Sequence, residues 1–236
     1  MSAAGEAPAA ERDRAGGNGH GGRGNGARAR SSLRAIIGPV SAEGLRPDLA
    51  LVADWIPRAS RVLDLGCGDG SLLAYLRKAK QCQGYGVEID DAQVLACVER
   101  GVDVIQRNIE DGLDLFSRTR FDVVVLSMAI QATHQTERVL REMSEIGTEG
   151  IVSLPNFGHW THSLSLLRGR MPVSRELPYA WYDTPNLHMA TVRDFEDLLA
   201  KLDLQVTASA FLANGVPVRL WPSGRATQAI YRFRRR

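Results

Sequence analysis

One glycine-rich stretch constrains the fold of this chain more than any other part of it. Residues 62–70 read VLDLGCGDG, an apolar run that ends in three glycines at alternate positions, and SLLAYL follows at 71–76. An apolar run, a glycine turn and a helical period in this order predict a buried strand, a tight turn and a helix start. We therefore predict a βα junction that cradles a nucleotide. A purely structural turn in another kind of α/β protein is the alternative.

The spacing of the glycines indicates the class of ligand. A dinucleotide-binding fold has its third glycine three positions after the second, but position 71 is serine here. The Gly-x-Gly-x-Gly pattern, opened by an acid, instead resembles the loop of class I S-adenosylmethionine (SAM) methyltransferases. SAM has no phosphate, so such a loop has only to let backbone approach its ribose and its amino-acid tail. The resemblance implies that SAM, or S-adenosylhomocysteine (SAH), contacts Asp64, Gly66, Cys67, Gly68 and Gly70.

A second apolar run, at 84–90, carries an acid at the matching distance. Glu88 lies 22 residues after Gly66. An acid about 20 residues beyond the loop, at the end of the second strand, accepts hydrogen bonds from a ribose diol. We therefore place Glu88 and Ile89 in the cofactor site. Asp90 is expected to cap the helix that follows.

The third strand, at 102–106, ends in a sequence that departs from the methyltransferase pattern. Those enzymes usually have a Gly-Asp pair here, whose acid receives the adenine amino group, but this chain has Arg107 and Asn108. Asn108 keeps an acceptor oxygen without the charge, whereas Arg107 replaces a glycine where backbone comes close. Asn108 and Ile109 are predicted cofactor residues, and the fit of adenine beside Arg107 is left open.

The rest of the chain alternates between strands and amphipathic helices. Strands are expected at 121–127 and 150–155, with a helix at 136–146 between them. This alternation predicts a doubly wound α/β sheet whose ligands lie at the carboxyl ends of strands one, two and four, where Ser127 falls. The fold implied is Rossmann-like, with a mostly parallel seven-stranded sheet. An antiparallel C-terminal hairpin, at 204–211 and 229–233, completes it.

Composition and length set the expected domain organisation. Residues 1–34 are rich in glycine and arginine and poor in large apolar side chains, so we expect a disordered extension; weak attraction of RNA or anions is a second interpretation. Residues 35–236 are predicted to form one domain with a lid insertion at about 156–187. The formal charge of +2 gives no overall bias toward nucleic acid or membranes. Three unpaired cysteines and the lack of a membrane span favour a cytoplasmic protein.

The lid insertion concentrates aromatic, proline, arginine and histidine residues in one long connection. A connection of this length inside a domain is more often a lid or a binding surface than an idle loop. His159 and His162 have no third ligand placed by spacing, so we predict no metal site. The candidate substrate or partner residues of the lid are Asn156, His159, Trp160, Arg170, Tyr179, Trp181, Tyr182 and Asp183.

Three stretches of the lid sharpen the resemblance to one family. SLPNFGHW at 153–160, RGRMPV at 168–173 and LPYAWYDTPNLH at 177–188 resemble the methionine-biosynthesis protein MetW. The similarity runs from about residue 45 to 211. It implies a SAM-binding protein that supports homoserine O-acyltransferase, the enzyme that activates homoserine for methionine synthesis, as a partner. SAM, the downstream product of that pathway, would then tune the complex by binding its free and complexed forms with different affinities.

Two functions from different classes therefore remain open. In the first, the lid aromatics form part of a protein interface of an accessory protein. In the second, they close over a small acceptor and the protein is a working methyltransferase. Methyl transfer requires mainly proximity and orientation, so no catalytic residue is assigned. The sequence SMAIQ at 127–131 lacks the Asn/Asp-Pro-Pro-aromatic motif of enzymes that methylate amino groups, which argues against a nitrogen acceptor.

Overall fold

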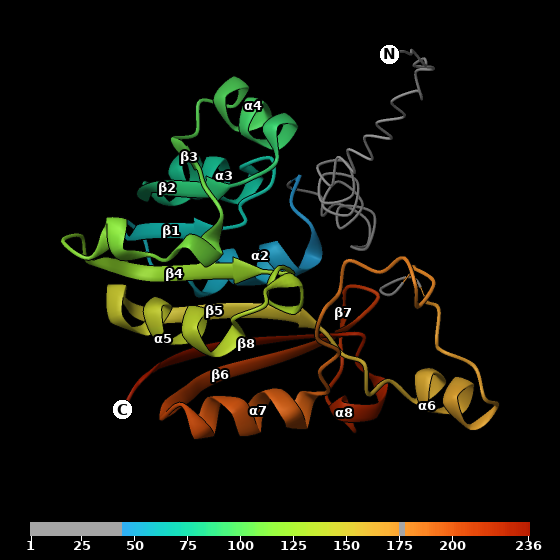
Figure 1. Cartoon of the computed structure of the whole chain (residues 1–236). Helices are drawn as coiled ribbons and strands as arrows, with labels where there is room; N and C mark the ends of the chain where they lie inside the picture. Colours follow the sequence, from blue (N-terminus) through green and yellow to red (C-terminus); the bar gives the residue numbers. More distant parts are fainter. Residues whose placement is uncertain (1–43, 175–177) are drawn as a thin grey trace, which may run out of the picture.

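The computed structural model describes residues 44–174 and 178–236, and the predicted extension at 1–34 lies outside them. Eight strands of the described chain form one sheet in the order β3-β2-β1-β4-β5-β8-β6-β7 (Figure 1). The first five strands pair in parallel, and the last three pair antiparallel. Their bounds are β1 Arg61–Leu65, β2 Gln83–Glu88, β3 Val104–Gln106, β4 Phe121–Ser127, β5 Gly147–Pro155, β6 Leu204–Ala213, β7 Val216–Pro217 and β8 Gln228–Arg235. The Rossmann-like fold predicted from the sequence is confirmed.

The eighth strand is the one departure from the seven strands predicted. β7 is only two residues long and pairs with the end of β6 across a two-residue turn. Asn214 and Gly215 form this turn with φ angles of 51° and 82°. An Asn-Gly pair with both residues left-handed is the usual tight turn of a β-hairpin, so this dipeptide is the sequence signal for the additional strand.

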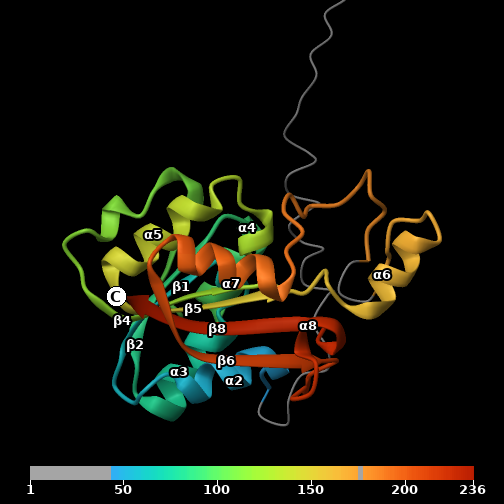
Figure 2. The ribbon, with the colours of Figure 1, turned by 90° about the horizontal axis from the view of Figure 1, so that it is seen from below.

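Helices cover both faces of the sheet (Figure 2). The central strands β1, β4 and β5 each contribute side chains to the core on both faces. Helices α2 Pro47–Trp55, α3 Ser71–Lys80 and α4 Asp91–Glu99 share one hydrophobic core, and α5 Thr136–Ile146 and α7 Val192–Lys201 share the other. On β4, Val123 and Val125 face the first core, while Val124 and Leu126 face the second. This alternation buries the strand on both sides, as a continuous run of β-branched residues requires.

Side-chain caps fix where the helices begin. Asp90 accepts hydrogen bonds from the amides of Ala92 and Gln93, and so begins α4 as predicted. Thr191 and Asp194 form a reciprocal capping box at the start of α7. On α4, however, the buried side chain is Cys97, and the larger apolar residues of that helix lie outside the core.

The connection between β5 and α7 leaves the body of the domain. It contains α6 Trp160–Leu167, which projects beyond the edge where β4 and β5 end (Figure 1). The short helix α8 Pro222–Arg225 lies near its start, because the side chain of Asn156 donates hydrogen bonds to the carbonyls of Ser223 and Ala226. In the described part of the chain, no helix is both long and apolar enough to cross a membrane.

Candidate functional site

The glycine loop after β1 is held open by its own backbone. Gly66, Gly68 and Gly70 all have positive φ angles, of 66°, 57° and 71°. The amides of Gly66 and Cys67 both donate to the carbonyl of Val87 on the neighbouring strand, at 2.7 and 3.1 Å. The loop is therefore fastened to β2, and its glycines leave backbone exposed to a ligand at the carboxyl edge of the sheet.

Glu88 joins this loop to the end of β2. One carboxylate oxygen accepts from the amide of Gly68 at 2.9 Å. The other accepts from the amides of Ile89 and Asp90 at 2.7 and 3.0 Å. A carboxylate has about four acceptor positions, so three backbone bonds fix its orientation and leave capacity for a hydroxyl.

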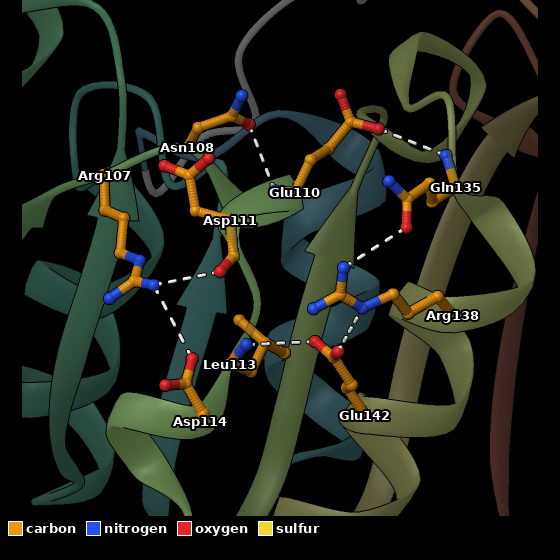
Figure 3. Close-up of polar contacts among 9 residues, drawn as sticks. All are labelled: Arg107, Asn108, Glu110, Asp111, Leu113, Asp114, Gln135, Arg138 and Glu142. Carbon is orange, nitrogen blue, oxygen red and sulfur yellow. Dashed lines mark hydrogen bonds and ion pairs between the residues drawn. The ribbon is translucent and has the colours of Figure 1, made fainter.

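Asn108 follows β3 and lies beside Glu88, whose carbonyl accepts from the amide of Arg107 at 2.9 Å. The side-chain oxygen of Asn108 accepts from the amide of Glu110 at 3.1 Å and caps the short helix η2 Ile109–Asp111. Figure 3 shows the Arg107 side chain directed away from Asn108, toward the carbonyl of Asp111 and the carboxylate of Asp114. Arg107 is thus turned out of the site, and its replacement of glycine does not fill the space beside Asn108.

Two carboxylates fasten this connection to α5, as Figure 3 also shows. Glu110 accepts from the amide of Gln135, just before α5, at 3.1 Å. Glu142, within α5, accepts from the amide of Leu113 at 2.9 Å and from Arg138 at 2.6 Å. An acid beside a helix N-terminus is also favoured by the helix dipole. The wall of the site after β3 is therefore pinned to a helix on the far side of β4.

A buried polar network closes the opposite end, where β4 and β5 finish. Arg46, just before α2, donates to a carboxylate oxygen of Asp48 at 3.2 Å and to the hydroxyl of Ser127 at 3.3 Å. The Ser127 hydroxyl also bonds the same Asp48 oxygen, at 3.2 Å, and the hydroxyl of Ser153, at 2.9 Å. Asp48 is fully buried. Three separate elements thus meet around one ion pair.

A cavity lies between these walls, at the carboxyl ends of β1, β2, β3 and β4. Ligands of doubly wound sheets bind at this edge, where the strand order reverses. Among the described residues, Arg46 is the one positively charged side chain that lines it, against three acids. The lining residues are Arg46, Gly66, Gly68, Glu88, Ile89, Asp90, Gln93, Asn108, Ile109, Glu110, Ser127, Met128, Ala129, Ala132 and Thr133.

Most of the cofactor residues proposed from the sequence line this cavity. Gly66, Gly68, Glu88, Ile89, Asn108, Ile109 and Ser127 do so. Asp64, Cys67 and Gly70 do not line it: Asp64 and Cys67 are buried, and Gly70 ends the loop at the start of α3. The sequence interpretation missed Arg46, which it treated only as part of a helix start, and Met128, whose φ of 53° holds it in the left-handed region directly after β4. An arginine before a helix carries no local signal for a ligand, because its role depends on Ser127, 81 positions away.

The side chains of Asp64, Cys67 and Cys97 are buried beside the loop. Burial raises the pKa of Asp64 from 3.8 to about 7, and nearby Arg46 opposes this rise while Glu88 and Asp69 add to it. The sulfur atoms of Cys67 and Cys97 lie 3.7 Å apart. Their hydrogen bond, followed by burial, raises the pKa of the Cys67 thiol above its ordinary range. At pH 7 the Asp64 carboxyl is therefore about half ionised, whereas the Cys67 thiol stays protonated.

The lid aromatics point outward. Trp160, Trp181 and Tyr182 are 50, 70 and 76% exposed, and the rings of Trp181 and Tyr182 meet edge to face at 5.6 Å. More than half of the exposed large apolar side chains in the described chain fall on this one segment. They are Trp160, Leu166, Leu167, Met171, Val173, Trp181, Tyr182, Leu187 and Met189, which we call the lid patch.

The other candidate residues of the lid differ in burial and in the contacts that they make. Asn156 is buried at the foot of the lid, His159 caps α6, and the ring of buried His162 contacts the carbonyl of Phe157 at 3.0 Å. Tyr179 is half-buried against Trp181, whereas Arg170 and Asp183 are exposed. Within residues 44–174 and 178–236, no three metal-binding side chains are grouped around a common point.

Comparison with known proteins places this architecture. The model of the family "Methionine biosynthesis protein MetW" matches residues 46–233. A "Bifunctional methionine biosynthesis protein MetXA/MetW" from Rhodopirellula baltica is 34% identical over 177 residues, which cover 71% of this chain and 28% of that relative. The chain therefore spans less than a third of that protein.

Solved structures with the same fold are SAM-dependent methyltransferases of low sequence identity. One from Thermotoga maritima is 17% identical with a TM-score of 0.58, covering 89% of this chain and 93% of that one. One from Archaeoglobus fulgidus is 14% identical with a TM-score of 0.57, covering 79 and 90%. The plantazolicin methyltransferase, solved with SAH, is 14% identical with a TM-score of 0.55, covering 80% of each chain. These likenesses establish the fold, and the family match over residues 46–233 establishes that this chain belongs to the MetW family of methionine biosynthesis proteins.

Proposed function

We propose that this chain is a SAM-binding accessory protein that docks on homoserine O-acyltransferase in methionine biosynthesis, in the cytoplasm. The exposed lid patch is the observation that carries the docking role. The name of the Rhodopirellula baltica relative joins a MetXA part and a MetW part in one protein. We take the MetXA part to be the acyltransferase, so that the two activities work side by side in that protein.

The side chains and backbone that line the cavity suit SAM or SAH chemically. Glu88 offers a fixed carboxylate to a ribose diol, and the loop glycines leave room for backbone contact. Arg46, the one cation among the described lining residues, suits the carboxylate of the ligand, and the acids Glu88, Asp90 and Glu110 suit its positive charges. Asn108 and Ile109 would flank the adenine. When bound, SAM would supply a sulfonium charge and a transferable methyl group.

The lid patch has the properties of a protein interface. Trp and Tyr are the side chains that most often dominate binding energy at interfaces, and large exposed apolar patches are rare on proteins that act alone. A stable interface buries about 800 Å² on each partner, and the lid patch spreads over α6 and the two loops that follow it. Outward aromatics favour a partner over a lid closed on a small acceptor.

The C-terminal end of the lid, at Leu187 and His188, contacts the wall of the cavity, which supports regulation by the ligand. The carbonyl of Gln131, in the short helix η4 Ile130–Ala132, accepts from the amides of Leu187 and His188 at 2.9 and 3.1 Å. The next residue, Ala132, lines the cavity. We propose that occupancy of the cavity biases the lid through η4, so that SAM binds the free and complexed protein with different affinities.

The docking role is tested by measuring the affinity of this protein for the homoserine O-acyltransferase of the same cell. Trp181→Ala and Tyr182→Ala should each weaken the complex by roughly 30-fold or more, as expected of aromatic residues at the centre of an interface. Both side chains are exposed, so thermal unfolding should stay close to that of the wild type.

A matched control uses apolar side chains that are equally exposed elsewhere. Leu95 and Val98 on α4 are 59 and 60% exposed, and α4 lies far from the lid in Figure 1. Leu95→Ala and Val98→Ala should leave the affinity unchanged. Equal losses in both pairs, or no complex with the wild type, would contradict the docking role. Methylation of a small molecule by the isolated protein would instead support the alternative, a working methyltransferase.

A further inference from the structure

Arg46 is a cation held in place with part of its hydrogen-bonding capacity unused. Both bonds that the structure shows leave from one terminal nitrogen, to Asp48 and to Ser127. Its Nε atom is buried and has no partner among the described residues. A guanidinium has five N–H donors arranged as a fork that fits a carboxylate. A buried donor without a partner is unfavourable, so a ligand that satisfies this donor would gain affinity from it.

Asp48 and the two serines determine where this cation points. Asp48 is fully buried, and its Oδ2 atom accepts hydrogen bonds from both Arg46 and Ser127. Ser153 holds Ser127 in turn, and its hydroxyl also accepts from the amide of Met128 at 3.1 Å. Met128 and Ser127 line the cavity together with Arg46. The network therefore positions the arginine against the cavity at the end of β4.

A structural ion pair at the start of α2 is the simpler interpretation. It explains why Asp48 needs a positive partner, since a fully buried carboxylate is costly alone. It does not explain why the arginine keeps 26% of its side chain exposed and lines the cavity. A purely structural pair does not require that, among the described lining residues, one cation stands with three acids at the cavity. Charge complementarity indicates a ligand with one negative group at this end.

We infer that Arg46 binds the α-carboxylate of the amino-acid end of the adenosyl ligand, with Asp48 as its positioning residue. This rests on the proposed SAM site and assigns its specificity. Glu88, at the other end of the cavity, would take the ribose, so recognition is divided between two charged side chains of opposite sign. The cavity then distinguishes adenosyl ligands that keep the carboxylate from those that lack it.

Two ligands that differ only in this carboxylate test the inference. SAM and decarboxylated SAM share the adenosine, the sulfonium and the amino group, and their affinities are measured by equilibrium titration of the full chain. The wild type should bind SAM about 10- to 100-fold more tightly, the range expected of a hydrogen-bonded charge pair. Arg46→Met should reduce SAM to the affinity of decarboxylated SAM and leave the latter nearly unchanged. Arg46→Lys should recover part of the preference.

Controls separate this inference from folding and from the proposed function. Arg58→Met removes an exposed arginine whose visible bond is to the carbonyl of Ala79, outside the cavity, and should leave both affinities unchanged. Retained binding of decarboxylated SAM shows that Arg46→Met is folded.

Four outcomes would overturn the inference. A wild type that binds both ligands equally, or an Arg46→Met variant that weakens both equally, refutes the role of Arg46 alone and leaves the SAM site standing. A wild type that binds neither ligand refutes the SAM site as well. Binding of free homoserine that depends on Arg46, without any effect on SAM, would assign the carboxylate to a free amino acid instead.

Discussion

Replacement of Gly70 by alanine should destabilise the protein through two separable effects. Gly70 precedes α3 with a φ of 71°, a conformation that disfavours an L side chain by roughly 1–2 kcal/mol. A Cβ atom there would also lie 3.0 Å from the sulfur of Cys97 and 3.2 Å from a methyl group of Val102. Both neighbours are buried and cannot move freely, so overpacking adds about 1–3 kcal/mol.

Gly169 offers the matched control for backbone strain. Its φ is 72°, nearly the same, but an added Cβ would have no atom within 4 Å. Alanine also restricts the unfolded chain, which returns roughly 0.4–1 kcal/mol in both variants. We therefore expect Gly169→Ala to lower the free energy of unfolding by about 1 kcal/mol and Gly70→Ala by about 2–4 kcal/mol. For a domain of this size the latter lowers Tm by roughly 5–12 °C.

Urea titration followed by far-ultraviolet circular dichroism measures both values under the same conditions. Cys97→Ala, combined with Gly70→Ala, should recover about 1 kcal/mol of the loss in a double-mutant cycle, because it removes the nearest atom. Equal destabilisation by Gly70→Ala and Gly169→Ala would refute the reasoning, since it would mean that the contacts behind the loop carry no energy.

Three further predictions concern the site and the lid. Because the folded pKa of Asp64 is raised to about 7, the stability of the protein should fall as pH rises from about 4 to 7. In thermal unfolding, Asp64→Asn should be more stable than the wild type at pH 8, by at most about 4 kcal/mol, and should show no gain at pH 4. Glu88→Gln places an amide against backbone donors, so it should weaken SAM binding at least 10-fold in equilibrium titration, and unchanged affinity would remove Glu88 from the site. Asn156→Ala removes two hydrogen bonds donated to the carbonyls of Ser223 and Ala226 and two accepted from the amides of Gly158 and Val192. It should lower the unfolding free energy by about 3 kcal/mol, and a loss below 1 kcal/mol would show that the Asn156 side chain is dispensable.

The sequence predicted the elements that depend on local patterning. The strand at 121–127 and the helix at 136–146 have the same bounds in β4 and α5, because continuous β-branched residues and a helical apolar stripe are strong signals. Glu88 and the glycine loop were placed by their spacing, and the structure brings them within one hydrogen bond of each other. Site residues whose separation along two neighbouring strands is characteristic can therefore be predicted from the sequence.

The rest depends on tertiary contacts that leave no local pattern. Ser127 accepts a hydrogen bond from Arg46 and donates one to Asp48, across 81 and 79 residues, so the sequence showed only a proline and an acid in a first helical turn. The sequence left open whether adenine fits beside Arg107, and the structure shows the Arg107 side chain directed toward Asp114. Leu95 and Val98 of α4 are exposed, because Cys97 is the residue of that helix that is buried against the glycine loop.

The central claim is best tested by the rate of acyl transfer to homoserine, measured with the acyltransferase of the same cell while this protein and SAM are titrated in turn. The account predicts a rate that depends on this protein, a co-eluting complex, and a further change as SAM fills the cavity. A rate unaffected by this protein, with no complex, would contradict the accessory role and direct the search to methyl acceptors.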